Sequence, residues 1–109
     1  MARNKKPIEF CGDALARLRD FPADAKREAG YQLDRVQSGD MPIHFRPMPT
    51  VGSGVVEIKI RESDGAFRIF YVASRGDAVY VLHCFQKKSQ KTDRQDIEVG
   101  RQRYSELPH

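Results

Sequence analysis

A run of apolar residues in this chain is followed directly by lysines. Residues 79–85 are mainly β-branched, aromatic or otherwise apolar, and Lys87, Lys88 and Lys91 come next. The run is typical of a β-strand, and its apolar side chains fall on both alternating faces, which predicts a central strand covered on both sides. A rigid strand that delivers three cations to one edge of a sheet would suit the phosphate backbone of a nucleic acid.

Further cations lie in the two segments before this strand. Lys59 and Arg61 alternate with apolar residues, a pattern that fits either an ordinary solvated strand face or a basic face that follows RNA. Arg68 lies among apolar and aromatic residues, where an unpaired charge is costly. It therefore either forms a salt bridge, with Glu57 as the first candidate, or binds a phosphate, whose oxygens match the guanidinium in bidentate geometry.

Three side chains are candidates for proton transfer: His83, Tyr71 and His44. A lone histidine in an apolar strand, such as His83, is more often a hydrogen-bonded core residue than a catalyst, and Tyr71 has the parity of a core residue. His44 lies in a proline-rich segment, from which it could reach a site or remain an ordinary surface residue. The chain has no catalytic triad order, glycine-rich phosphate loop or Cys/His cluster, so we predict no metal site.

Composition indicates one soluble globular domain over residues 1–109, with flexible ends at 1–6 and 108–109. The formal net charge is +4 and the pI about 9.3, a mild signal for an anionic partner. No signal peptide or membrane-spanning run is present, and the two cysteines are expected to be reduced in the core. These features favour a cytoplasmic protein with no membrane partner.

The elements that would position the candidate residues follow from patterning. We expect strands over residues 7–11, 55–60, 66–74 and 79–85, and helices over 14–20, 22–37 and 92–107. Asp13 is the expected cap of the first helix, and Thr92 opens a capping box for the last. Three prolines and two glycines make residues 41–54 a connection with no helix or central strand. The order β-α-α-β-β-β-α predicts an α+β fold, a helical hairpin laid on an antiparallel meander.

Alternation also predicts which side chains share a face. In residues 55–60 we expect the core face to carry Val56, Ile58 and Ile60, with Glu57, Lys59 and Arg61 on the other. In residues 79–85 we expect one face to carry Val79, Val81 and Phe85, and the other Tyr80, Leu82 and Cys84.

The segments 54–60, 65–71, 79–88 and 90–92 together resemble the phage-derived branch of the RelE/HigB toxin superfamily, and the likeness extends over residues 7–106. The resemblance implies a RelE-like fold with helices on a small antiparallel sheet. It also implies the toxin of a type II toxin–antitoxin system, an endoribonuclease that cleaves mRNA, commonly on the ribosome, without metal or cofactor. The implied partner is an antitoxin, usually a helix-turn-helix protein.

The resemblance also implies roles for particular residues. Arg68 matches the arginine of the family's Phe-Arg-x-x-Tyr segment, and Lys87 and Lys88 match its paired lysines, so these three are the expected catalytic residues. The cations expected to bind RNA are Lys59, Arg61, Lys91 and Arg46. The acid–base residues that some members carry near the C-terminal end have no match here, although a lysine could serve as the base if neighbouring cations lower its pKa. Alternatives are a non-catalytic RNA-binding or regulatory domain and a structural phage protein.

Overall fold

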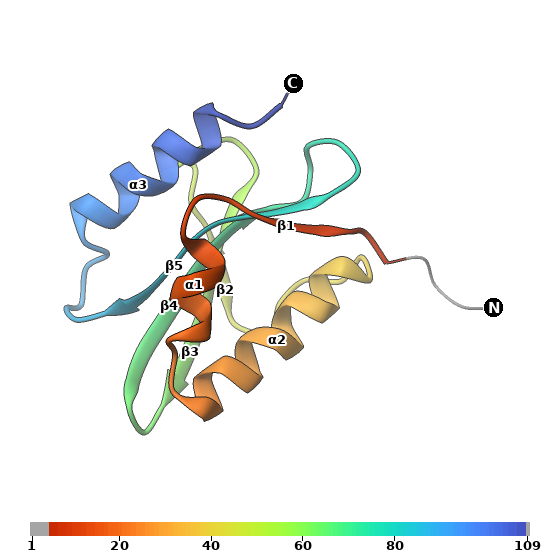
Figure 1. Cartoon of the computed structure of the whole chain (residues 1–109). Helices are drawn as coiled ribbons and strands as arrows, with labels where there is room; N and C mark the ends of the chain where they lie inside the picture. The colour runs from red at the N-terminus through yellow and green to blue at the C-terminus, as the bar shows by residue number, and fades with distance from the viewer. Residues whose placement is uncertain (1–4, 109) are drawn as a thin grey trace.

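A mixed sheet of five strands, in the order β1-β5-β4-β3-β2, organises the chain in this computed structural model, which describes residues 5–108. Helices cover both faces of the sheet (Figure 1). In chain order the elements are β1 (Ile8–Phe10), α1 (Ala14–Arg19), α2 (Ala23–Gln37), β2 (Phe45–Pro47), β3 (Val55–Glu62), β4 (Gly65–Val72), β5 (Val79–Lys87) and α3 (Arg94–Ser105). The α+β class is as predicted.

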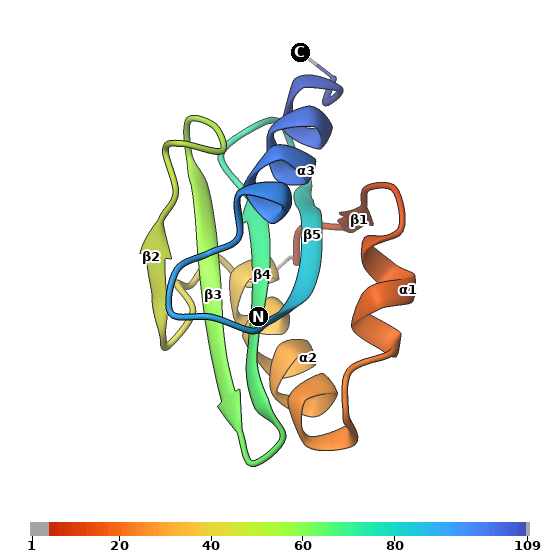
Figure 2. The same cartoon turned by 90° about the vertical axis from the view of Figure 1, so that its left-hand side faces the viewer.

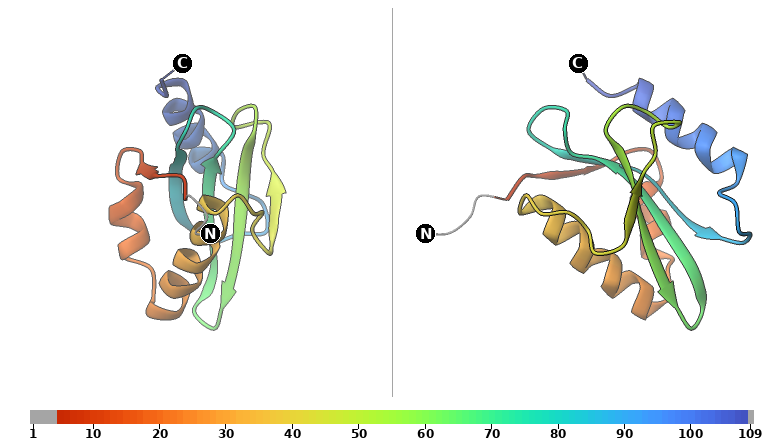
Figure 3. Two further views of the ribbon diagram at one scale, coloured as in Figure 1. Left: turned by 90° about the vertical axis from the view of Figure 1, so that its right-hand side faces the viewer. Right: turned by 180° about the vertical axis from the view of Figure 1, so that it is seen from behind.

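The sheet differs from the prediction in two respects. β1 pairs with β5 in parallel, so the sheet is mixed and not wholly antiparallel. Residues 11–78 lie between these two strands, which is ample length for the chain to return in the same direction. In addition, the proline-rich segment contains β2, a three-residue strand at the outer edge of the sheet (Figure 3). An edge position tolerates Pro47, which cannot donate a ladder hydrogen bond. β3, β4 and β5 form the predicted antiparallel meander.

A hydrophobic cluster on each face of the sheet holds the layers together. The apolar stripe of α2 is buried against β3, β4 and β5, together with Leu18 of α1; the stripe consists of Ala25, Ala29, Leu33 and Val36. Under α3, the cluster includes Phe70, Phe85 and Leu107. α3 comes close to the sheet because Gly100 lacks a Cβ, which would lie 2.9 Å from the ring of Phe70. Full burial of each large apolar side chain contributes about 1.5–3 kcal/mol.

β5 contains an irregularity that changes the direction of its side chains. Val81 and His83 lie opposite consecutive residues of β4, so Leu82 has no partner. Such a β-bulge interrupts the alternation of faces. Phe85 consequently belongs to the cluster under α3, and Cys84 to the cluster under α1 and α2. The predicted faces of Phe85 and Cys84 were therefore wrong, because alternation was carried through the bulge.

Of the two predicted helix caps, Asp13 has the predicted position and Thr92 does not. Asp13 occupies the N-cap position of α1, but its carboxylate makes no capping bond and accepts from Arg17 Nε and Arg103 Nη2, at 3.1 and 2.7 Å. The N-cap of α3 is Asp93, whose side chain accepts a backbone N–H of the first turn at 2.9 Å. Thr92 lies one residue earlier, and its hydroxyl is engaged elsewhere.

Of the chain ends expected to be flexible, residues 1–4 and 109 lie outside the described residues. Lys6 donates its backbone N–H to the carbonyl of Gln37 at 2.9 Å and its ammonium to the carbonyl of Ala73 at 2.6 Å. Within residues 5–108, no helix is both long enough and apolar enough to cross a membrane.

Candidate functional site

Cross-strand pairing brings most of the predicted cations onto the α3 side of the sheet. Residues directly opposite each other in antiparallel strands share a face. Three successive rows on this side are Arg46–Glu57–Phe70–His83, Lys59–Arg68–Phe85 and Arg61–Ala66–Lys87. Phe70 and Phe85 of these rows pack under α3. We call the cations of the three rows the basic face; they are Arg46, Lys59, Arg61, Arg68 and Lys87.

The connection between β5 and α3, residues 88–93, crosses over this face. Figure 2 shows it passing in front of β4 and β3 before the chain turns into α3. We call it the lysine loop, because it carries Lys88 and Lys91, both of which are exposed. Lys91 lines a small hollow of about 240 Å³, which Lys87 and Lys88 share with Asp93 and Asp96. The loop therefore adds two of the predicted cations to those of the sheet.

Two larger hollows lie on the basic face and share Arg61 and Arg68. One, of about 570 Å³, is also lined by His44 and Lys59 and by the acidic residues Glu28 and Glu62. The other, of about 530 Å³, is also lined by Lys87 and by Lys88 of the lysine loop. Because the hollows adjoin at two arginines, they form one depression in which cations outnumber carboxylates, and an extended anion could occupy it.

Glu57 lies at the centre of the site, and sequence reasoning missed its importance. Its side chain is fully buried, although alternation placed it on a solvated face. It accepts hydrogen bonds from Arg46 Nε at 2.8 Å and from Thr92 Oγ1 at 3.2 Å, and Arg68 Nε lies 3.7 Å away. A buried carboxylate is stable only when it is paired in this way. The alternation of Glu57 with Lys59 and Arg61 along one strand was the available sequence signal.

Arg68 fits both of the interpretations that the sequence left open. It is 7% exposed and forms an ion pair with Glu57, as the salt-bridge interpretation predicts. However, its Nε is buried without a hydrogen-bond partner, and its Nη1 donates only to the carbonyl of Phe67, at 3.1 Å. Burial lowers the pKa of Arg68 from its usual value, an effect that Glu57 opposes. Its side chain also lines both large hollows, so it is placed to meet a ligand there.

Lys87, at the end of β5, is the lysine whose proton affinity is altered. The pKa of its ammonium is lowered from the usual 10.5, first by partial burial and then by the positive charge of Arg68; Arg46 and Lys59 also lower it. Glu57 opposes the change. A lysine with a lowered pKa is more readily present as the neutral amine, which is the form that can accept a proton.

Of the three candidates for proton transfer, only His44 lies at the basic face. His83 is 1% exposed under α3, and its Nε2 lies 2.8 Å from Asp96 Oδ1. Burial lowers the pKa of His83, and its Nδ1 has no hydrogen-bond partner. Tyr71 is buried in the cluster under α1 and α2, on the opposite side of the sheet, and burial raises its pKa to about 12. The structure thus separates two of the candidates from the cations.

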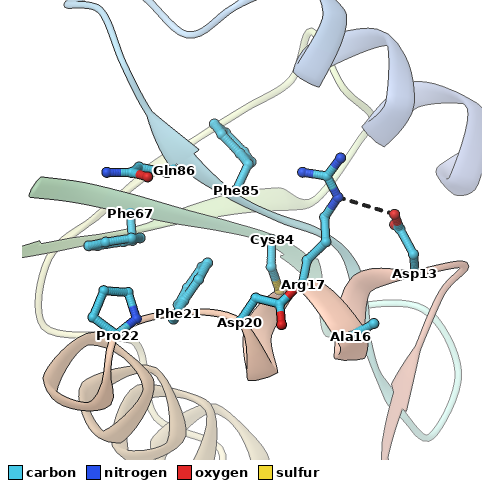
Figure 4. A pocket seen from close by; sticks show the side chains of 10 residues that line it. All are labelled: Asp13, Ala16, Arg17, Asp20, Phe21, Pro22, Phe67, Cys84, Phe85 and Gln86. Atoms are coloured by element: carbon cyan, nitrogen blue, oxygen red, sulfur yellow. Dashed lines mark hydrogen bonds and ion pairs between the residues drawn. The ribbon is translucent and has the colours of Figure 1, made fainter.

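A separate hollow of about 430 Å³ lies between α1 and the end of β5 (Figure 4). Nothing in the sequence indicated it. Phe21, Phe67 and Cys84 contribute apolar lining, while Arg17 forms an ion pair with Asp13 at its rim. Burial raises the pKa of Cys84 to about 12, so this thiol stays protonated. Across residues 5–108, no group of three His, Cys, Asp or Glu side chains is arranged to hold a metal ion.

Comparison with solved structures assigns the fold to a known class. The structure is similar to that of the E. coli toxin RelE, solved in the free state as a mutant with two arginines changed to alanine. The TM-score is 0.62 at 18% sequence identity, and the match covers 95% of this chain and 99% of that chain. The chain therefore has a RelE-like fold. No curated protein matches it.

The sequence also identifies the family. Residues 16–105 match the model of the family described as Phage derived protein Gp49-like. This chain belongs to that family. The phage-derived family and the RelE-like fold bear out the predicted resemblance to the phage-derived branch of the RelE/HigB superfamily.

Proposed function

We propose that this protein is the toxin of a type II toxin–antitoxin system and that it cleaves mRNA as a metal-independent endoribonuclease. One observation carries the proposal. Arg68 is surrounded by Lys59, Arg61, Lys87 and Lys88, and among the described residues no carboxylate lies within ion-pair distance of any of these four. A group of unpaired cations around a half-satisfied arginine is suited to an RNA phosphate.

The proposed reaction is attack of a ribose 2′-OH on the adjacent phosphorus, with departure of the 5′-oxygen. It needs a base, an acid and stabilisation of the charge on the non-bridging oxygens. Arg68 and Arg61, which line both large hollows, and Lys88, which lines the second, supply the stabilising charge. Lys87, whose pKa is lowered, takes the proton of the 2′-OH. His44, in the hollow shared with Arg61 and Arg68, donates a proton to the leaving oxygen.

The remaining cations would hold the RNA on either side of the cleaved bond. Lys59 lines the hollow that contains His44, and Lys91 lines the small hollow at the other end of the site. Contacts of this kind fix the position of the chain of phosphates without reading bases. His83 and Tyr71, both buried away from the hollows, receive no role in the reaction.

Membership of the Gp49-like family and the RelE-like fold support a partner antitoxin. In keeping with the sequence resemblance, we propose that this antitoxin is a helix-turn-helix protein and that the mRNA is cut on the ribosome in the cytoplasm. The basic face would then be the surface that the antitoxin must cover or distort.

Induction of the chain alone in bacteria tests the proposal. We expect growth arrest and loss of translated transcripts, and Arg68→Lys should reduce cleavage on the order of 10²-fold, because a point charge replaces a planar fork of donors. Cleavage of RNA and thermal melting are to be measured on the same samples.

Arg68→Lys is also the matched control for folding, since it keeps a positive charge beside buried Glu57. It should melt close to the parent. Normal growth while folded parent protein accumulates would contradict the toxin proposal and favour a non-catalytic RNA-binding domain.

A further inference from the structure

The lysine loop can present Lys88 at the basic face only if its backbone is held in one position. It leaves the sheet at the end of β5 and crosses β4 to reach β3 (Figure 2). Lys88, Ser89, Gln90 and Lys91 are exposed, and the hydroxyl of Ser89 donates to the carbonyl of Lys91 at 2.7 Å, a bond within the loop itself. Exposed backbone without a tertiary anchor opens readily. The position of Lys88 over Arg68 therefore depends on where the far end of the loop is fixed.

Thr92 fixes the far end through a closed triangle of hydrogen bonds. Its hydroxyl donates to Glu57 Oε2 at 3.2 Å and accepts from Arg46 Nη2 at 2.9 Å. Arg46 Nε donates to Glu57 Oε1 at 2.8 Å. The three side chains come from the edge strand β2, the neighbouring strand β3 and the loop, so the triangle joins three separate segments.

The triangle connects a buried residue of the sheet, Glu57, to the start of α3. Glu57 is fully buried, and bonds to a charged group in a dry environment are stronger than those between neutral groups. Thr92 is followed directly by Asp93, the N-cap of α3. The triangle therefore sets both where the loop ends and where the last helix begins.

The same geometry changes the interpretation of Arg46. Arg46 was among the cations expected to bind RNA, but its Nε and Nη2 are already engaged with Glu57 and Thr92. Arg68, by contrast, keeps an Nε without a hydrogen-bond partner. Within the basic face, Arg46 is thus the arginine committed to the protein itself.

We propose that Thr92 and Arg46 are positioning residues: through Glu57 they hold the lysine loop over the basic face. The proposal rests on the proposed function, because the loop supplies Lys88 to the cleavage site. Removal of the Thr92 hydroxyl should release the loop without removing any cation from the site.

Substitutions at the two threonines of the chain test this. Thr92→Val keeps the side-chain shape and loses both hydrogen bonds, whereas Thr92→Ser keeps the hydroxyl. Thr50→Val, at an exposed position, is the matched control. Hydrogen exchange is to be measured at the amides of residues 88–92 and of β3, β4 and β5.

We expect Thr92→Val to accelerate exchange at residues 88–92 while the three strands keep their protection. Cleavage should fall about tenfold, mainly in kcat, because a misplaced charge affects the transition state more than binding. Thr92→Ser and Thr50→Val should resemble the parent in both measurements. Unchanged exchange at residues 88–92 in Thr92→Val would overturn the proposal.

A double-mutant cycle with Arg46→Lys separates positioning from phosphate binding. Lysine keeps a cation near Glu57 but cannot serve both partners at once. If both residues act through one triangle, the double variant should lose no more cleavage than the worse single variant. Additive losses would mean that Arg46 meets RNA directly and would overturn its role. The exchange measurement needs no RNA and therefore tests the anchoring of the loop on its own. A parent protein that cleaves no RNA would refute the proposed function without affecting that test.

Discussion

Single carboxyl and amino groups set the chemistry of the basic face. Glu57 alternates with Lys59 and Arg61 along β3, and alternation alone places all three in solvent. In the structure, the lysine loop and Arg46 cover Glu57, because Thr92 and Arg46 both donate hydrogen bonds to its carboxylate. The result is one buried negative charge beneath a group of positive charges. Such an arrangement keeps Arg68 in place and leaves the outer cations without partners.

The lowered pKa of Lys87 leads to a prediction about pH. Lys87→Arg should bind RNA but cut it roughly 10²–10⁴-fold more slowly, because arginine stays charged and cannot take a proton. In the parent, the pH profile of kcat should be bell-shaped, with one inflection set by Lys87, because the reaction needs Lys87 neutral and His44 protonated. Lys59 contributes to lowering that pKa, so Lys59→Met should raise the pKa and move the inflection to higher pH. The pH profile of kcat under saturating RNA measures both effects.

Lys26→Met is the control for this experiment, because it removes a lysine from the exposed surface of α2. Its profile should coincide with that of the parent. An inflection that stays fixed in Lys59→Met would show that Lys87 is not the base.

At the scale of elements, periodicity predicted the helices and strands, which depend on local sequence. It missed the features that depend on contacts between residues far apart in the chain. The helices and the meander were found because apolar residues recur at helical and strand spacing. The bulge at Leu82 was not predicted. In a strand that is apolar on both faces, the sequence does not show where one residue lacks a cross-strand partner. Thr92 has the sequence of a capping residue, but its hydroxyl bonds to residues far away in the chain. The cations were predicted because charge in a strand is conspicuous, whereas the loop over them depends on the assembled sheet.

The contact between α3 and β5 depends on His83. Its Nε2 bonds to Asp96 in the first turn of α3, and its ring stacks on Phe85 at a centroid distance of 4.9 Å. Burial is the largest cause that lowers the pKa of His83 below its usual 6.5. The folded protein therefore favours the neutral ring with Nε2–H donating to the carboxylate.

We expect the free energy of unfolding to depend on pH through this residue. A histidine with a lowered pKa contributes stability that is fully present above its unfolded pKa and is lost as the pH falls towards its folded pKa. Below about pH 6.5 the parent should lose up to about 1.4 kcal/mol per pH unit more than His83→Gln, which cannot titrate. Urea unfolding of both proteins between pH 5 and pH 8 measures the difference. Parallel curves for parent and variant would show that His83 takes up its proton equally in both states.

At the scale of the whole molecule, the net charge of +4 is less informative than its distribution. Several cations away from the basic face have carboxylate partners, as in the pair of Arg27 with Asp24 and that of Arg94 with Glu98. Lys59, Arg61, Lys87 and Lys88 have none among the described residues. The sheet thus gathers its unpaired charge on the side bounded by the lysine loop, which composition alone could not predict.

RNA binding should weaken steeply with salt, and the basic face should account for the slope. Each phosphate contact with a single strand contributes roughly 0.7 to the slope of log affinity against log salt, because a bound cation releases a counterion. The double variant Lys59→Gln/Arg61→Gln should therefore flatten the slope by about 1.4. Lys26→Gln/Arg27→Gln removes the same charge from the exposed surface of α2, on the opposite side of the sheet, and should leave the slope unchanged. Equal flattening in both double variants would mean that RNA responds to net charge and has no preferred face. Fluorescence anisotropy with a short unstructured RNA, titrated at several salt concentrations, distinguishes the two outcomes.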